Sequence, residues 1–102
     1  MEGMFSGCKY FNSPIGYWDV SNNRNFSRMF YGCEIFNQPL NDWNVGKTET
    51  MEFMFNGAAN FNQSLCKWDI SSNKNFCRMF RNCKRLEWSS DTWHIAEDKN
   101  TK

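Results

Sequence analysis

The chain has 102 residues, a formal net charge of +1 and an aromatic content of 18%. This balanced charge provides no overall steering toward nucleic acid or an anionic membrane. The sequence also contains no run of about 18 apolar residues of the kind that crosses a bilayer. Its five cysteines and single histidine match no zinc-binding spacing, so we expect reduced thiols and neither a metal nor a cofactor.

The sequence repeats itself at a constant interval. Residues 28–45 read RMFYGCEIFNQPLNDWNV, residues 53–70 read FMFNGAANFNQSLCKWDI and residues 3–20 read GMFSGCKYFNSPIGYWDV. A fixed period of this length indicates stacked supersecondary units. We expect one repeat domain over 1–95, with coils over about 1–25, 26–50, 51–75 and 76–95, followed by a charged tail over 96–102.

Each coil begins with a segment whose apolar residues follow a helical period. In the second coil these residues, spaced at i, i+3, i+4 and i+7, are Phe26, Met29, Phe30 and Cys33. This spacing predicts one face of a short helix. Asn25, and Thr50 and Asn75 in the later coils, would cap its start, and Gly32 would end it.

Later in each coil, alternation predicts a short strand. Trp43 and Val45 lie two residues apart and would point to the same side. The tryptophan recurs as Trp18, Trp43, Trp68 and Trp93. A lone coil buries too little apolar surface to fold, so the coils must stack. We expect an α/β repeat solenoid of about four coils with one parallel sheet, in which each aromatic ring rests on its counterpart in the next coil.

An asparagine column accompanies the aromatic columns at Asn12, Asn37 and Asn62. Each asparagine follows a phenylalanine that must point inward. We interpret the column as a structural ladder, in which side-chain amides bond to backbone groups at a bend between coils. A ligand-binding role is the less favoured interpretation.

The combined pattern MFxGCxxFNxPLxxWDVSxxxNF resembles the repeat of similar length in BspA-like surface proteins and lipoproteins of bacteria, which has relatives in large DNA viruses. The resemblance covers residues 1 to about 95 and implies a leucine-rich-repeat-like right-handed solenoid with a role in recognition or adhesion. It brings no catalytic residues. Since the sequence has no signal peptide, lipid-attachment cysteine or cell-wall anchor, we expect an intracellular or virion location over export.

The first coil has no capping segment before it. Met1, Met4 and Phe5 would then lie at an unsealed apolar end of the stack. Such an end is usually an interface. We expect it to dock a protein partner or a second copy, and a longer array is the alternative.

No residue constellation indicates catalysis. His94 should face solvent, and Cys66 and Cys77 are candidate exposed thiols. Asp19 and Asp69 should lie farther apart than the carboxylates of retaining glycosidases and at the upper edge for inverting ones. Their column offers too few oxygens for calcium, so we favour a solvated face. A basic cluster near the last expected helix comprises Lys74, Arg78, Arg81, Lys84 and Arg85. Acidic and apolar residues interrupt the same stripe in other coils, so nucleic-acid binding is the least favoured function.

Positions that vary between coils while the core columns stay constant define a candidate interaction surface. They are Tyr17, Asp42 and Lys67 before the tryptophan column, and Tyr31, Asn56 and Arg81 on the expected helix. We therefore expect a non-enzymatic protein-interaction or scaffold module. The alternative is a structural component of a large assembly, such as a minor capsid or virion protein.

Overall fold

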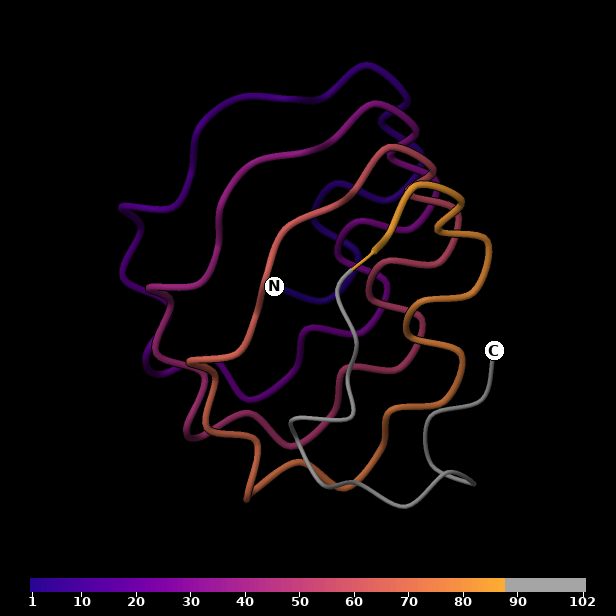
Figure 1. The fold of residues 1–102 in the computed structure, drawn as a ribbon. Coiled ribbons are helices and arrows are strands. Elements are labelled where there is room, and N and C mark those ends of the chain that lie inside the picture. Colours follow the sequence, from indigo (N-terminus) through magenta and orange to yellow (C-terminus); the bar gives the residue numbers. More distant parts are fainter. Residues whose placement is uncertain (88–102) are drawn as a thin grey trace.

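The computed structural model describes residues 1–87, in which successive coils follow parallel courses through space (Figure 1). Coils 1, 2 and 3 comprise residues 1–25, 26–50 and 51–75, and residues 76–87 begin the next. Within 1–87 there is no helix and no strand; the only sheet-like pairs are isolated parallel bridges that join Asn25 to Thr50 and Thr50 to Asn75. The predicted leucine-rich-repeat-like α/β solenoid, with a helix and a strand in each coil and one parallel sheet, is therefore wrong.

In place of a helix, each coil begins with overlapping turns, which we term the turn ribbon (residues 1–8, 26–33, 51–58 and 76–83). Within the second ribbon, the N–H groups of Met29 and Tyr31 bond to the carbonyls of Phe26 and Arg28, three residues earlier. The N–H groups of the even-numbered ribbon residues instead bond to carbonyls about one repeat further along the chain, in the pairs Phe26–Thr50, Arg28–Glu52, Phe30–Met54 and Gly32–Asn56. The ladder between coils thus uses alternate residues of the ribbon.

Left-handed backbone conformations explain why the ribbon cannot be a helix. The third and seventh positions of every ribbon have positive φ, as at Arg28 (58°) and Gly32 (72°). An α-helix needs φ near −63° at each residue. An isolated eight-residue helix would also leave its first four N–H groups and last four carbonyls unpaired, whereas the ribbon pairs many of these groups with neighbouring coils.

The residues predicted to cap a helix do cap the ribbon. The side-chain oxygen of Asn25 accepts the N–H of Ser27 at 2.8 Å, and that of Asn75 accepts the N–H of Cys77 at 2.9 Å. Asparagine favours such local bonds at any turn. The capping signal therefore located the start of an element correctly without specifying which element follows.

The segments around Trp18, Trp43 and Trp68 are also turns and not strands. The N–H of Trp43 bonds to the carbonyl of Leu40 at 3.0 Å. The indole N–H of Trp43 donates to the carbonyl of Ile15 at 3.0 Å, and that of Trp68 donates to the carbonyl of Leu40 at 2.8 Å. Each of these indoles therefore ties its coil to the preceding one, and Trp93 lies outside the described residues.

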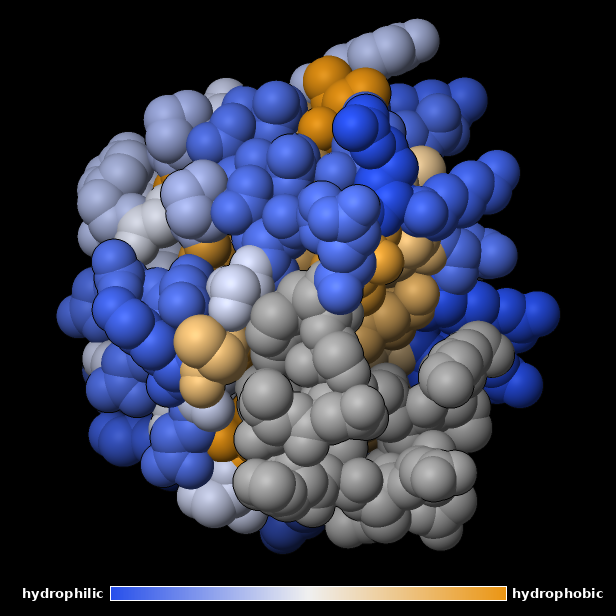
Figure 2. All heavy atoms as spheres, in the orientation of Figure 1, coloured by the Kyte–Doolittle hydropathy of each residue, from blue (hydrophilic) through white to orange (hydrophobic). Residues whose placement is uncertain are grey.

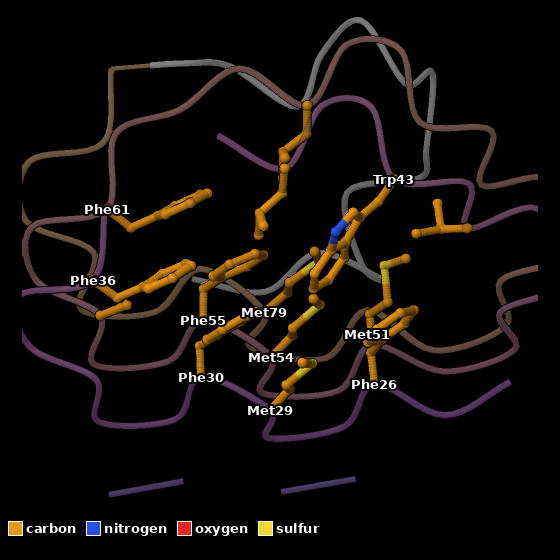
Figure 3. Close-up of a cluster of buried hydrophobic side chains, with 14 of the residues drawn as sticks. Phe26, Met29, Phe30, Phe36, Trp43, Met51, Met54, Phe55, Phe61 and Met79 are labelled. Carbon is orange, nitrogen blue, oxygen red and sulfur yellow. The ribbon is translucent and has the colours of Figure 1, made fainter. Parts of the chain in front are cut away.

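The core consists of side-chain columns that run through the coils (Figure 3). Stacked phenylalanine pairs have ring centroids 5.9 Å apart for Phe5–Phe30, 5.4 Å for Phe30–Phe55 and 5.6 Å for Phe55–Phe80. The apolar face predicted for the second coil is fully buried, at 0% exposure for Phe26, Met29, Phe30 and Cys33. The helical spacing thus identified the buried residues although the backbone is not helical. Hydrophilic residues cover most of the described surface in Figure 2.

The asparagine ladder lies at the bend after the ribbon. Asn12 Oδ1 accepts the N–H of Asn37, and Asn37 Oδ1 accepts the N–H of Asn62, both at 2.9 Å. The amides of Gln38 and Gln63 donate to the same two asparagines. These bonds satisfy backbone groups that no regular element pairs, as the structural interpretation requires.

Candidate interaction surface

The first row of variable residues lies along the outside of the stack. Tyr17, Asp42 and Lys67 occupy the same position in successive coils, and all three are exposed, with Tyr17 at 82%. Lys67 Nζ lies 3.3 Å from a carboxylate oxygen of Asp42. The side chains at this ion pair keep exposed fractions of 67% and 83%, so the pair contributes little to stability. The row therefore presents an aromatic, an acidic and a basic group on one frame.

A shallow groove of about 390 Å³ adjoins this row between coils 1 and 2. Its lining residues are Pro14, Gly16, Tyr17, Gln38, Pro39, Asn41 and Asp42. A Cβ atom at Gly16 would lie 2.7 Å from the Pro39 carbonyl oxygen. Glycine at this position therefore allows the close approach of the two coils beneath the groove.

Hydrogen bonds fix the polar wall of the groove. The Gln38 amide donates to the Asn12 carbonyl at 3.0 Å, and Asn41 Oδ1 accepts the N–H of Lys67 at 2.9 Å. The rings of Pro14 and Pro39 fix the φ angle at two further positions of the wall. We refer to Tyr17, Asp42, Lys67 and this groove together as the Tyr17 surface. Sequence reasoning found Tyr17, Asp42 and Lys67 but missed the groove, for which paired prolines in the repeat were the available signal.

The second row of variable residues does not form a continuous exposed surface. Tyr31 is 41% exposed, whereas Asn56 is only 8% exposed and directs its amide to the Arg78 carbonyl at 3.5 Å. Arg81 is exposed. The structure therefore separates Tyr31 from Arg81 by a buried residue, and of the candidate surface residues Asn56 has little side chain available for a partner.

The five residues of the basic cluster are all exposed. Lys74 lines a second hollow of about 350 Å³ together with Arg24 and Glu49. Glu49 pairs with Arg24 at 3.2 Å, and its carbonyl accepts the N–H of Lys74 at 2.8 Å. An acidic residue thus stands between two cations along the stack, which interrupts the positive field that a nucleic-acid backbone would need.

The cysteines have three kinds of environment, and all five are reduced. The thiols of Cys33 and Cys83 donate to backbone carbonyls of the preceding coil at 3.0 Å, and burial raises the pKa of each to about 12. Cys66 is exposed, and its pKa is lowered by hydrogen bonds from Ser64 and Asn41. Cys77, predicted to be exposed, is half-buried, and Cys8 is exposed on the first coil.

The acidic column has a local structural role. Asp19 Oδ1 accepts the N–H and the hydroxyl of Ser21 at 3.0 and 2.6 Å, and Asp69 Oδ1 accepts the N–H of Ser71 at 3.0 Å. These hydrogen bonds lower the pKa of both carboxyl groups. Each aspartate therefore stabilises its own turn. His94, predicted to face solvent, lies outside the described residues.

Residues 1–87 contain neither a metal-binding cluster nor a membrane-spanning helix. No group of three or more His, Cys, Asp or Glu side chains is arranged to hold a metal ion. No helix in this part of the chain has the length and apolar character needed to cross a membrane.

Comparison with known proteins replaces the resemblance suggested by the sequence. No curated protein and no solved structure matches the chain. Residues 1–102 match a family described as "Mycoplasma protein of unknown function, DUF285". This is a different family from the BspA-like leucine-rich-repeat proteins, so that assignment is wrong, and the absence of helices and a sheet from residues 1–87 agrees with the correction. The match spans the full sequence, and the chain therefore belongs to the DUF285 family.

Proposed function

We propose that the chain is a non-enzymatic scaffold that binds a protein partner through the Tyr17 surface. The observation that carries this proposal is the position of Tyr17, 82% exposed beside a groove whose walls are held by bonds between coils. Exposed tyrosines beside apolar pockets are typical of residues that dominate binding energy, because a large ring is buried at low entropic cost.

The chemistry of the groove indicates what kind of segment it would bind. Pro14, Pro39 and the Tyr17 ring offer apolar contact, while Asp42 and Lys67 offer charges at the rim. A partner segment would place an apolar side chain between the prolines and a polar or charged group near the ion pair. The rim charges would then favour one orientation and the apolar floor would supply most of the affinity.

The variation between coils supports the same proposal. Buried columns repeat nearly unchanged, whereas the exposed position before each tryptophan changes from Tyr17 to Asp42 to Lys67. A stack that served only as a spacer would have no need of three different chemistries on a common frame.

A random peptide library displayed on phage and selected on the intact chain tests the proposal. Tyr10 provides a matched control because it lies in the same coil, is 84% exposed and does not line the groove. We expect selected peptides to lose about thirtyfold in affinity for Tyr17→Ala, the loss typical of a binding hot spot, and to bind Tyr10→Ala as they bind the unmodified chain.

Three results would overturn the proposal. These are a selection that yields no binding peptide, peptides that bind Tyr17→Ala as tightly as the unmodified chain, and an equal loss of affinity for both tyrosine variants. Circular dichroism of the two variants checks that neither substitution has altered the fold.

The alternative function, a structural component of a large assembly, draws on a different surface. Met4 is 51% exposed on the outer side of coil 1. An apolar end of this kind suits assembly with other subunits.

A further inference from the structure

The outer face of coil 1 differs from every internal face of the stack in how much apolar surface it exposes. Met4 is 51% exposed, whereas its counterparts Met29, Met54 and Met79 are all at 0%. Phe5, Phe11 and Trp18 are partly buried, and their counterparts in coils 2 and 3 are at most 4% exposed. The residue types are the same, so the difference arises from the coil that covers each internal face.

The backbone of this face carries unpaired acceptors in a regular register. In the second ribbon the carbonyls of Ser27, Met29 and Tyr31 accept N–H groups from coil 1 at 2.9, 3.0 and 2.7 Å. The equivalent carbonyls of coil 1 belong to Glu2, Met4 and Ser6. They accept no hydrogen bond from any residue of 1–87.

The same face carries unpaired donors at the positions where later coils reach backward. Trp43 and Trp68 donate their indole N–H to the preceding coil, and Asn37 donates its N–H to the preceding Asn12. The equivalent donors are the indole of Trp18 and the N–H of Asn12, and they find no acceptor within the described part of the chain.

We infer that the outer face of coil 1 binds a further coil of this same repeat, stacked in parallel and in register. Such a coil supplies ribbon N–H groups to Glu2, Met4 and Ser6 and carbonyl or amide oxygens to Trp18 and Asn12, as internal coils do for one another. It would also cover Met4, as the preceding coil covers Met29. Binding through the edge of a hydrogen-bonded ladder is an established recognition mode.

The arrangement of donors and acceptors also restricts how the partner is oriented. Two outer faces placed with ribbon against ribbon would oppose acceptor to acceptor, and with tryptophan against tryptophan would oppose donor to donor. A dimer in that arrangement leaves these groups unpaired, which is unfavourable for each group that becomes buried. A parallel coil in register supplies the complementary set.

Fusion of an added coil to the full chain tests this inference independently of the Tyr17 surface. Residues 26–50 are placed directly before Met1, because Thr50 is followed by Met51 in the natural register and Met1 is equivalent to Met51. The control carries the same added segment with its residues in shuffled order. The readout is the alkylation rate of Cys8, measured by peptide mapping, since Cys8 is exposed while its counterpart Cys33 is buried.

We expect the in-register fusion to slow Cys8 alkylation by about tenfold relative to the shuffled control, because reaction then requires local opening of the new interface. Amide exchange should slow at the ribbon residues of the added coil. A Met4→Asp substitution within the fusion should restore both rates. Equal Cys8 alkylation in the fusion and in the shuffled control would overturn the inference, even if phage-selected peptides bound the Tyr17 surface.

Discussion

Replacement of Phe36 by alanine tests whether the stacked aromatic columns hold the fold together. The Phe36 ring is fully buried, with centroid distances of 4.2 Å to Phe30, 5.6 Å to Phe11 and 6.0 Å to Phe61. Truncation of a buried phenylalanine to alanine costs about 3–5 kcal/mol. The contacts cross coils in both directions, so we expect the upper half of that range.

Against a total stability of about 5–15 kcal/mol for a small domain, such a loss is large. It corresponds to a fall in Tm of roughly 15 °C or more for a chain of this size. Urea denaturation followed by tryptophan fluorescence measures the free energy, and differential scanning calorimetry measures Tm. Tyr10→Ala, at a residue 84% exposed, is the control and should change stability by less than about 0.5 kcal/mol. A Phe36→Ala loss below about 1 kcal/mol would refute the reasoning, because a ring stacked on both neighbours cannot be removed so cheaply.

Three other predictions concern the ribbon, the ladder and the thiols. Gly57→Ala should destabilise the fold more than Gly7→Ala in urea denaturation: both residues have positive φ, but an added Cβ meets the preceding coil's backbone at 3.4 Å at Gly57 and nothing within 4 Å at Gly7. Equal losses of stability in the two variants would mean that contact with the added Cβ does not limit the spacing of the coils at Gly57. Asn37→Ala should lower stability by about 1 kcal/mol in thermal melts, since a ladder N–H loses its acceptor; an unchanged Tm would contradict the ladder's role. Iodoacetamide should alkylate Cys66, whose pKa is lowered, well below the pH needed for Cys33, whose pKa burial raises to about 12; equal rates at one pH would exclude that difference.

The sequence was sufficient to predict the buried apolar columns and how the coils align. The constant repeat period places Phe5, Phe30 and Phe55 in one column, and their rings do stack. The asparagine ladder followed from the same alignment. Both predictions depend only on periodicity and on the need to bury apolar surface, which act regardless of the local backbone conformation.

Secondary structure could not be predicted in the same way. The spacing of Phe26, Met29, Phe30 and Cys33 satisfies a helix, yet the turn ribbon buries the same four residues. The deciding feature is positive φ at the third ribbon position, which is occupied by Arg28 and Phe53 in coils 2 and 3. Arginine and phenylalanine rarely adopt that conformation, so the residue types at this position did not indicate it. Gly32 was the visible signal, and it was interpreted as the end of a helix.

The candidate site was predicted in part. Variation between coils located Tyr17, Asp42 and Lys67, since exposed positions are free to change. The same criterion also selected Asn56, which is buried because its amide is directed to the Arg78 carbonyl of the next coil. Variation between coils cannot distinguish a residue that contacts a partner from one that adapts to a neighbouring coil. The groove was missed because the repeated prolines alone do not define it: it also depends on how closely two coils approach at Gly16.

The strained ribbon positions show how the stack can hold large side chains where glycine would fit more easily. A left-handed conformation costs about 1–2 kcal/mol for a residue with a Cβ, and Arg28 and Phe53 both adopt it. In return, their N–H groups enter the ladder at 3.0 and 2.9 Å, and the Arg28 guanidinium lies 4.8 Å from the centre of the Phe53 ring. A cation above an aromatic face contributes about 0.5–1 kcal/mol at an exposed site. Because each coil thus offsets its strain through contacts with the next, neighbouring coils stabilise the ribbon jointly. In coil 1 the equivalent residue is Gly3, which adopts the same conformation without that cost and donates its N–H to the Ser27 carbonyl of coil 2 at 2.9 Å.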